Sequence, residues 1–560
     1  MPGRGLFKRL LTVDEAIDRV HGAVGERLRE RMLRDTSSVP VWDLAGRIVA
    51  ESVRALRSLP WYPRSIVDGC AVRSSDVAGA FEDRPVELRV LGRVRIGTRP
   101  AVRVGIGECA LVDTGSWVPL GADAVVPIEY IRLEDGRALV ERGRPPGANI
   151  ALPASDVSEG DVVAWRGAPA TPEVAAALAS LGIRSVKASR RLRVAVVSTG
   201  EELVEPGEEP GEAGIFDSNR YFLLNTFRLA GFEVADGGIV GDSVDDVAAA
   251  IQRHIDNGAD LIVTSGGTSA GVDDVVPRAV ERLGRLIFHG LRIKPGKPTL
   301  AGVVGDAIVV GLPGNPRSTA NVVDKFLYPL LSRLGVPLGP VKPEMRLRAT
   351  LLSSVEGERG RDTIIPVALA GELAVPLARE SYMIASYAAA DGYIVVPASS
   401  MEPLRMGETV EVRAWRPPSR SVLVATDTRL WKPPEGVRAI YAPMPWEEAE
   451  KLAGSGIASI AAAPAGAATG RWARIGVRRV VLVSRSSRCQ EAAVFSPYVT
   501  MYPDLIPGEA RVIPVRRAAG AASLYSDGYV DCTVIPEDYA SNLPGNMTPL
   551  AQEAIVATQK

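Results

Sequence analysis

The chain has 560 residues, 46% hydrophobic and 23% charged, which is the composition of a globular protein, and this length predicts roughly three to five domains. The formal net charge of −1 argues against binding to nucleic acid through a broad basic surface. Four scattered cysteines without a C-x-x-C pair, and three histidines without metal-ligand spacing, exclude zinc fingers, iron–sulfur clusters and a disulfide scaffold.

The chain carries no recognisable targeting or membrane signal. Its basic N-terminus is followed by an amphipathic segment, so we expect no signal peptide. No apolar run approaches the roughly 20 residues that span a membrane. We therefore expect a cytoplasmic protein without membrane or nucleic-acid partners.

The first third of the chain reads as a helix, a β-rich region and a second short helix. Thr12 and Glu15 have capping-box spacing, which predicts a helix that begins there. From about residue 42 to residue 149 short Val-rich segments alternate with Gly and Pro, as half-buried strands do. A short helical segment then follows, with Thr171 as its cap and Gly182 after its end.

The middle of the chain, from about residue 192 to residue 334, has an α/β pattern. Apolar runs alternate with helical patterns near residues 218–230, 245–257 and 316–331. Strands that are apolar on both faces and alternate with helices indicate a parallel sheet. Short strands return from about residue 341 to residue 413 and suggest a small β-barrel or sandwich. Residues 415–420 read as a linker, and the remainder reads as another α/β segment.

Four loops of the middle region each follow an apolar strand: Ser198–Glu202, Gly241–Asp242, Ser265–Asp274 and Gly311–Pro316. In open α/β sheets ligands bind outside the carboxyl ends of the strands, so we expect these loops to converge.

The composition of these loops fits a phosphorylated ligand with a metal ion. Glycines let backbone amides approach an anion, and Glu202, Asp242 and Asp274 are oxygen donors of the kind that Mg²⁺ prefers. Asn315 and Pro316 suit the cap and first turn of the last helix. For each loop alone, an ordinary turn or a helix cap is the alternative interpretation.

Two lysines form a further signal. The chain has nine lysines among its 65 basic residues, and Lys294 and Lys297 are the only two between Lys187 and Lys325. Prolines beside them stiffen the segment. Two compact ammonium groups on a rigid loop could hold a small tetrahedral oxyanion, although a solvated turn is the alternative.

These residues together resemble the molybdopterin molybdenumtransferase family, which comprises the MoeA proteins and the gephyrin E-domain. The resemblance covers residues 10–415 in the family's order. Its motifs are Ser65–Val72, Thr114–Gly115, Pro119–Val126 with Glu129, Ser198–Leu203, Asp217–Asn219, Ser265–Asp274, Lys294–Pro298 and Leu312–Pro316.

The resemblance implies an elongated homodimer and an α/β multidomain fold, with a Rossmann-like molybdopterin-binding domain between β-rich domains. The expected domains are a split linker domain (10–42 and 150–188), an inserted β-rich domain (43–149), the molybdopterin-binding domain (190–335) and a C-terminal β-barrel (340–415). The implied reaction hydrolyses adenylylated molybdopterin, inserts molybdate or tungstate with Mg²⁺, and releases AMP. Dithiolene sulfurs on the substrate would explain the lack of a cysteine cluster.

The resemblance also assigns residues to roles. The functional acids are Asp68, Glu202, Asp242 and Asp274. Asp242 and Asp274 would hold the metal and phosphate, Glu202 would contact the pterin or the metal, and Asp68 would reach the cleft from the dimer mate. Lys294, Lys297 and Ser269 are assigned to molybdate. The remaining cofactor-binding positions are Thr199, Gly200, Gly266, Gly267, Pro313, Gly314, Asn315 and Pro316.

Three departures from the family pattern qualify this assignment. Asn149 stands where some members carry an acid. Cys70 replaces a tyrosine, and is either a reactive thiol or a small core residue. Arg317 replaces a small apolar residue and could add an anion contact.

Residues 419–560 lie outside the resemblance and faintly resemble a periplasmic-binding-protein-like module, which could bind molybdate or tungstate or serve only packing.

Two rival functions for the whole chain are molybdopterin adenylylation and non-catalytic scaffolding. The adenylyltransferase of the same pathway is a further expected partner. The sequence does not distinguish molybdate from tungstate.

Overall fold

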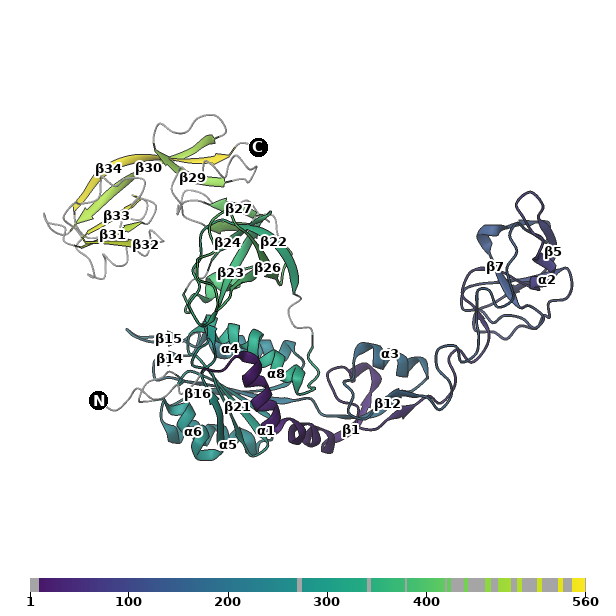
Figure 1. Ribbon diagram of the computed structural model, residues 1–560, viewed down its shortest axis with the longest axis horizontal. Coiled ribbons are helices and arrows are strands. Elements are labelled where there is room, and N and C mark those ends of the chain that lie inside the picture. The colour runs from purple at the N-terminus through teal and green to yellow at the C-terminus, as the bar shows by residue number, and fades with distance from the viewer. Residues whose placement is uncertain are drawn as a thin grey trace.

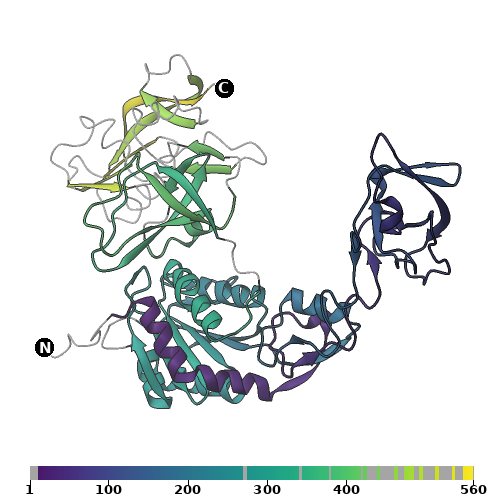
Figure 2. The same cartoon turned by 45° about the vertical axis from the view of Figure 1, so that its right-hand side comes forward.

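The computed structural model describes residues 10–268, 274–339, 344–377 and 380–417 and, beyond them, eight strands of the C-terminal segment. The molecule is extended: a central body carries a long arm on one side and a β-barrel on another, and the C-terminal strands lie beyond the barrel (Figures 1 and 2). Among the described residues, no helix combines the length and apolarity that crossing a membrane requires.

The base of the arm joins two stretches that are far apart in sequence. Helix α1 (Val13–Arg34) begins at the expected capping box: the Glu15 amide donates to Thr12 Oγ1 at 3.2 Å, and the Thr12 amide donates to Glu15 Oε2 at 2.9 Å. Strand β1 then pairs antiparallel with β12. The elements of the base are β1 (Thr36–Pro40), η1 (Val41–Asp43), β2 (Val53–Arg54), β11 (Val162–Ala164), α3 (Pro172–Ser180) and β12 (Ser185–Ser189).

The base extends further into the sequence than we expected. Leu44 and Val49 are buried in one core with Leu178 and Ala188, and β2 pairs with β11. Residues 44–54, which the sequence analysis assigned to the inserted domain, therefore pack with the base. Short Val-rich strands look alike in sequence whichever sheet they join, so the period-two pattern could not locate this boundary.

The tip of the arm is a β domain. Its sheet has the strand order β7-β4-β6-β5-β9-β8. The elements are β3 (Arg64–Ser65), β4 (Gly69–Val72), α2 (Ser74–Val77), β5 (Val86–Val94), β6 (Glu108–Val112), β7 (Ala124–Pro127), η2 (Ile128–Tyr130), β8 (Ile131–Glu134), β9 (Arg137–Val140) and β10 (Ile150–Ala151).

The central body is the expected α/β domain. Its six-stranded sheet has the order β16-β13-β17-β21-β20-β18, in which the first four strands are mutually parallel. The strands are β13 (Arg193–Thr199), β16 (Glu233–Val240), β17 (Leu261–Ser265), β18 (Arg285–His289), β20 (Leu300–Val304) and β21 (Ala307–Leu312), with a small pair β14 (Leu203–Val204) and β15 (Ile215–Phe216). The helices are α4 (Ser218–Leu229), α5 (Val244–Asp256), α6 (Val275–Leu283), α7 (Pro316–Val322), η3 (Val323–Leu327) and α8 (Tyr328–Arg333).

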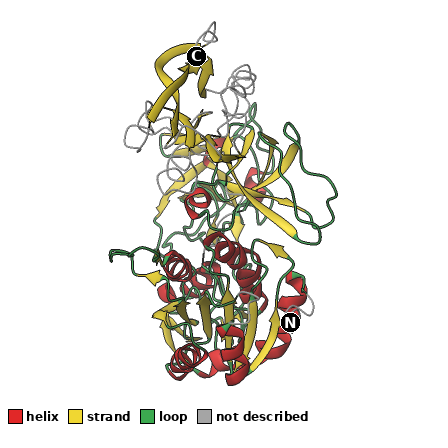
Figure 3. Cartoon of the chain, turned by 90° about the vertical axis from the view of Figure 1, so that its left-hand side faces the viewer, coloured by secondary structure: helices red, strands yellow, loops and turns green. Residues whose placement is uncertain are grey.

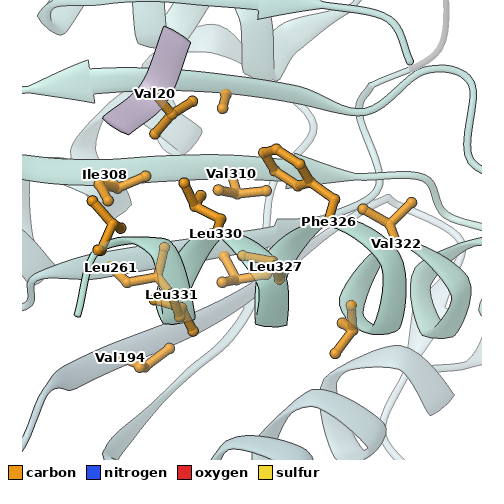
Figure 4. Packing of buried hydrophobic residues seen from close by; sticks show 14 of the residues in the cluster. Val20, Val194, Leu261, Ile308, Val310, Val322, Phe326, Leu327, Leu330 and Leu331 are labelled. Atoms are coloured by element: carbon orange, nitrogen blue, oxygen red, sulfur yellow. The ribbon is translucent and has the colours of Figure 1, made fainter. Parts of the chain in front are cut away.

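Helices cover both faces of this sheet, as Figure 3 shows. Val194, Leu261 and Val310 pack on one face against residues of α1, α4 and α8 (Figure 4). Ala195 and Ile262 pack on the other face against α5 and α6. The apolar runs in the sequence therefore reflect burial on two sides, as a parallel sheet requires.

The barrel follows the central body. Its strands are β22 (Met345–Leu351), β23 (Asp362–Ala370), β24 (Leu373–Pro376), β25 (Gly392–Val396) and β26 (Thr409–Ala414), with helix α9 (Ile384–Ala388). Pairing of β23 with β25 closes the sheet. Strand β19 (Ile293–Lys294), from the central body, pairs with β23, so the lysine loop is tied to the barrel.

The C-terminal segment contributes an eight-stranded sheet with the order β28-β27-β29-β34-β30-β33-β31-β32. The strands are β27 (Ser421–Val424), β28 (Arg438–Tyr441), β29 (Ser459–Pro464), β30 (Trp472–Ser484), β31 (Glu491–Phe495), β32 (Arg511–Val515), β33 (Cys532–Pro536) and β34 (Asn546–Thr558). The expected helices between them lie outside the described residues.

Candidate active site at the carboxyl edge of the central sheet

The strand order brings the four expected loops to one edge of the sheet. Strands β16, β13, β17 and β21 are neighbours and run in the same direction, so their carboxyl ends lie side by side. The loops that follow them hold Asp242, Thr199–Glu202, Gly266–Thr268 and Pro313–Pro316. This edge is where open α/β sheets bind their ligands, and we refer to it as the crevice.

Hydrogen bonds tie these loops together. Thr199 Oγ1 donates to Asp242 Oδ1 at 3.0 Å, which joins the first two loops. The buried Asn219, at the start of α4, donates from Nδ2 to Ser265 Oγ at 2.8 Å and to the Gly314 carbonyl at 2.7 Å. Sequence reasoning used Asn219 only as part of a motif and missed this connecting role. Its position in the first turn of the helix expected near residue 218 was the available signal.

Two positions in these loops require glycine, Gly266 through close approach of backbone and Gly200 through its φ of +152°. Gly266 has a φ of +95°, and a Cβ there would lie 2.2 Å from the Thr199 carbonyl oxygen. A Cβ on Gly200 would lie 2.8 Å from the carboxylate oxygens of Glu202, so the Glu202 side chain lies directly over the loop. Both positions keep backbone exposed to a ligand at the sheet edge.

The expected acids have different surroundings. Glu202 and Asp242 are exposed at the crevice, whereas Asp274 is buried at the start of α6. Ser269 lies outside the described residues. Within the described part of the chain, no three His, Cys, Asp or Glu side chains gather as a metal site. A pair of carboxylates still suits Mg²⁺, because this ion commonly takes one or two protein carboxylates and completes its shell with phosphate and water.

A cavity of about 540 Å³ separates the central body from the barrel. The lysine loop lines it with Lys294 and Lys297, and the barrel adds Arg361 and Ser381. Lys294 Nζ lies 2.9 Å from Glu358 Oε2, and Arg361 also pairs with Glu358. With Arg317, the lining carries four basic side chains against three acids, Glu356, Glu358 and Glu380, so its positive charge is in small excess.

Sequence reasoning missed the contribution of the barrel to this cavity. Arg361 and Ser381 belong to no recognisable motif, and only the pairing of β19 with β23 brings them to the lysine loop. No local sequence pattern reports such a long-range contact.

Two residues of the last loop behave differently from expectation. Asn315 occupies the cap position of α7, but its side chain makes no cap bond and donates instead to Ser381 Oγ of the barrel at 2.8 Å. Arg317 is buried and donates to the backbone carbonyls of Ile364 and Glu380. Burial lowers the pKa of Arg317 to about 10. Both residues therefore fasten the loop to the barrel.

The fourth expected acid lies elsewhere. Asp68 is exposed on the tip of the arm, which is far from the central body of its own chain (Figures 1 and 2). It accepts hydrogen bonds from the Thr114 amide (2.6 Å) and the Thr114 hydroxyl (3.0 Å), and these bonds lower its pKa. Asn149 adopts a left-handed φ of +59° and donates to the Val125 carbonyl at 2.8 Å, so its amide has a structural role.

Three sequence models of protein families match the chain in order. They are the MoeA N-terminal region comprising domains I and II (residues 11–182), the probable molybdopterin-binding domain (195–333) and the MoeA C-terminal region, domain IV (348–415). The three matched regions end at residue 415.

Individual proteins agree with these matches. The chain is 36% identical over 298 residues to the molybdopterin molybdenumtransferase of Synechococcus elongatus. This alignment covers 52% of this chain and 74% of the relative. It is 30% identical over 416 residues to a Methanocaldococcus jannaschii protein named for molybdopterin biosynthesis, covering 73% of this chain and 98% of that one. A crystal structure of the MoeA protein from Pyrococcus horikoshii OT3 has a TM-score of 0.57 at 27% identity, covering 72% of this chain and all of that one.

Proposed function

Because the chain belongs to the molybdopterin molybdenumtransferase (MoeA) family, we propose that it acts in molybdenum cofactor biosynthesis and inserts molybdenum into molybdopterin. The protein is accordingly a transferase whose substrates are molybdopterin and an oxyanion. The observation that carries the proposal is the basic cavity of Lys294, Lys297 and Arg361 beside the glycine loops of the sheet edge.

The glycine loops supply the site for adenylylated molybdopterin. Thr199, Gly200, Gly266 and Gly267 lie at the sheet edge, where backbone amides of glycine-rich loops can bind phosphate. Pro313, Gly314, Asn315 and Pro316 close the crevice from the last strand, and Asn219 holds the Gly314 carbonyl in place. We therefore assign these residues to the nucleotide and pterin.

Asp242 and Asp274 are the proposed magnesium ligands. When bound, Mg²⁺ would offset the negative charge of the phosphoanhydride during its hydrolysis. The Thr199 hydroxyl orients the Asp242 carboxylate, and Glu202 lies over Gly200 where it can contact the pterin or a metal-bound water.

The cavity between the central body and the barrel is the proposed oxyanion site. Lys294 and Lys297, which line it, would bind molybdate or tungstate, and Arg361 adds a third positive charge. Charge-assisted hydrogen bonds of this kind are among the stronger polar contacts in proteins. The phosphoanhydride is then hydrolysed, AMP leaves, and the substrate's dithiolene sulfurs receive the metal.

We further propose a homodimer in which Asp68 completes the site of the partner subunit. The arm tip, on which Asp68 directly precedes β4, is remote from the central body (Figure 1). Exposed apolar side chains lie near Asp68 in sequence or follow β10, which pairs with β3. These are Trp61, Ile66 and Leu152, which are 52%, 54% and 56% exposed. Apolar surface of this kind commonly marks a protein interface.

Mixed dimers test this arrangement. Asp68→Ala and Asp274→Ala should each inactivate the homodimer. If Asp68 acts in the partner's site, subunit exchange between the two inactive variants restores about a quarter of the sites, because half of the dimers then hold one intact site. If Asp68 acted in its own chain, mixing would restore nothing, and that outcome would refute the proposal.

The remaining partners and the location follow from this function. Adenylylated molybdopterin must come from an adenylyltransferase, which we propose as a partner, and we place the reaction in the cytoplasm. Matches to the MoeA regions on both sides of the molybdopterin-binding domain favour insertion over adenylylation by this chain itself.

The decisive assay supplies purified protein with adenylylated molybdopterin, Mg²⁺ and molybdate, and measures AMP release and cofactor yield. We expect oxyanion-dependent AMP release that is lost in Asp274→Ala. Lys294→Gln and Lys297→Gln should raise the KM for molybdate by about tenfold or more, since each loses a charge-assisted contact.

The control variant is Lys187→Gln, which removes an exposed lysine paired with Glu51 at 3.5 Å in the base of the arm. It should leave every kinetic constant unchanged. A rate of AMP release that is the same with and without molybdate would refute insertion as the function. Running tungstate beside molybdate determines the preferred metal.

A further inference from the structure

A buried arginine in the first turn of α4 contacts three acids at once. The side chain of Arg220 is 4% exposed. Its Nε donates to Asp217 Oδ2 at 3.0 Å, its Nη1 donates to Asp236 Oδ1 at 2.6 Å, and its Nη2 donates to Glu205. Charge-assisted hydrogen bonds are strong, and the planar guanidinium can direct several of them in fixed directions. The three acids are therefore held in defined positions around one side chain.

Each acid belongs to a different segment that leads to the site. Asp217 caps α4, the helix whose first turn joins the loops after β17 and β21. Glu205 directly follows β14, which itself begins directly after Glu202. Asp236 lies in β16, the strand that ends just before the loop of Asp242. One buried arginine thus contacts all three segments, and two of them lead to expected acids of the site.

Residues 203–216, which we call the flap, run from Glu202 to the cap of α4. The Ile215 amide donates to the Glu202 carbonyl at 2.7 Å. The Asp217 amide donates to the Val204 carbonyl at 3.0 Å. These bonds pair β14 with β15 at the margin of the central body (Figure 1). Both strands are only two residues long, and so short a pair is at most marginally stable by itself.

Glu205 fastens the flap to α4. Its carboxylate accepts hydrogen bonds from the Arg220 guanidinium and from the Tyr221 hydroxyl, the latter at 3.0 Å. The Glu202 carbonyl is bonded to the flap, and the Glu202 carboxylate lies over the glycine loop. A flap that moves would therefore also move Glu202, and the bonds of Glu205 to α4 oppose that movement.

Asp236 lies at an irregular part of β16. The pairing of β13 with β16 shifts register near the carboxyl ends of the two strands. Gly238 in this stretch has a φ of +70°, and its amide donates to Asp236 Oδ1 at 3.0 Å. Bulges of this kind bend a strand and are common next to active sites. Arg220 therefore holds the acid that fixes the bend of β16 ahead of Asp242.

We propose that Arg220 is a positioning residue of the insertion reaction, which holds the flap and the bend of β16 and thereby places Glu202 and Asp242 at the crevice. This inference rests on the proposed function and extends it to a buried residue that acts through its neighbours. Arg220 acts through Glu205 on the side of the site assigned to the pterin, and through Asp236 on the side assigned to the metal. The two branches can be tested separately.

Glu205→Gln tests the flap branch, and the fold should persist because Arg220 keeps its bonds to Asp217 and Asp236. Hydrogen exchange of the full chain without ligand, measured by mass spectrometry, reports whether the flap is held. Loss of the charged contact should speed the exchange of the flap amides by about tenfold. The rest of the central body should exchange as it does in the wild-type chain.

The AMP-release assay separates positioning from a loss of folded protein. Glu205→Gln should raise the KM for adenylylated molybdopterin by about tenfold, and Asp236→Asn should raise the Mg²⁺ concentration for half-maximal rate by a similar factor. Neither variant should change the KM for molybdate, which is assigned to the cavity near Lys294. A smaller folded fraction would instead lower kcat and leave all three half-saturation concentrations unchanged.

Arg220→Lys should combine both defects, because one ammonium group lacks the planar fork that reaches three acids. The matched control is Glu233→Gln, which removes an exposed acid of β16 paired with Arg193 at 2.9 Å and should leave exchange and kinetics unchanged. Unchanged flap exchange in Glu205→Gln, or a fall in kcat alone, would overturn the proposal. If the wild-type chain releases no AMP, the proposed function fails, and hydrogen exchange then decides by itself whether Arg220 holds the flap.

Discussion

Thr114 controls the charge of the acid on the arm. Its amide and hydroxyl both donate to Asp68 and lower the pKa of that carboxyl, so Asp68 stays ionised at pH values where an ordinary aspartate begins to protonate. Activity that needs the ionised form is lost only as pH falls through this lowered pKa.

Replacing Thr114 by valine removes the hydroxyl donor and keeps the amide. The pKa of Asp68 should rise towards its usual value, so the acid limb of the pH–activity profile should move to higher pH. Thr114→Ser retains the hydroxyl and serves as the control, with an unchanged profile. An identical acid limb in the valine and serine variants would show that Asp68 does not set it.

Cys70, in strand β4 directly after the Asp68 turn, is a core residue. Cys70 and Cys109 are fully buried with their Sγ atoms 2.9 Å apart, and the hydrogen bond with Cys109 together with burial raises the pKa of Cys70. A thiol with a raised pKa is mostly protonated and reacts slowly.

We expect neither Cys70 nor Cys109 to be alkylated by iodoacetamide in the folded protein at pH 8, and both to be alkylated in guanidinium chloride. Mass spectrometry of the peptides measures this, and fast labelling of folded protein would restore the reactive-thiol interpretation.

At the scale of elements, the site depends on how helix α4 begins. Asn219 donates to Ser265 Oγ and to the Gly314 carbonyl, which joins the loops after β17 and β21. Asn219→Asp has the same shape but has lost both donors and places a negative charge beside the Gly314 carbonyl. A buried polar group without its partner costs about 1–3 kcal/mol. If this cost displaces the two loops from their active positions, kcat/KM should fall by roughly 5–150-fold.

Asn225→Asp provides the matched control on the same helix. Its amide donates to the Tyr221 carbonyl within α4 at 2.7 Å and is exposed. Steady-state kinetics of both variants should separate them clearly. Equal activity in Asn219→Asp and the wild-type chain would show that the loops keep their positions without this bridge.

At the scale of the whole molecule, one buried ion pair fixes the arm to the central body. Arg190 follows β12 of the arm's base and donates to both carboxylate oxygens of Asp260 at 2.6 and 2.8 Å, and Asp260 is fully buried ahead of β17. Arg190 also donates to Asp35, after α1, at 2.8 Å. Three segments that are distant in sequence therefore meet at this point.

Asp260→Asn should lower the free energy of unfolding by about 3–5 kcal/mol, because it breaks a buried pair and leaves Arg190 with the exposed Asp35 as its remaining acidic partner among these contacts. Asp306→Asn is the control: it removes an exposed acid 3.7 Å from Arg27, a pair worth at most about 1 kcal/mol. Denaturant unfolding monitored by circular dichroism compares the two. Similar stability in both variants would show that hydrophobic packing alone holds the arm.

Much of this molecule could be predicted from local sequence. The capping box at Thr12, the cap at Thr171 and the buried runs of β13, β17 and β21 follow from short-range patterns, and all were confirmed. The boundary of the arm's base and the roles of Asn219, Asn315 and Arg361 could not be predicted, because each depends on a contact between residues far apart in the chain.

The sequence by itself determined the α/β core, the family and the loops that carry the chemistry, because hydrophobic period, glycine placement and motif order are local properties. Only the tertiary structure decided that the barrel completes the lysine cavity, and that the arm tip, which holds Asp68, lies far from the central body of its own chain. Both facts depend on contacts between segments that are far apart in the chain, such as the pairing of β19 with β23, and no stretch of residues encodes these alone.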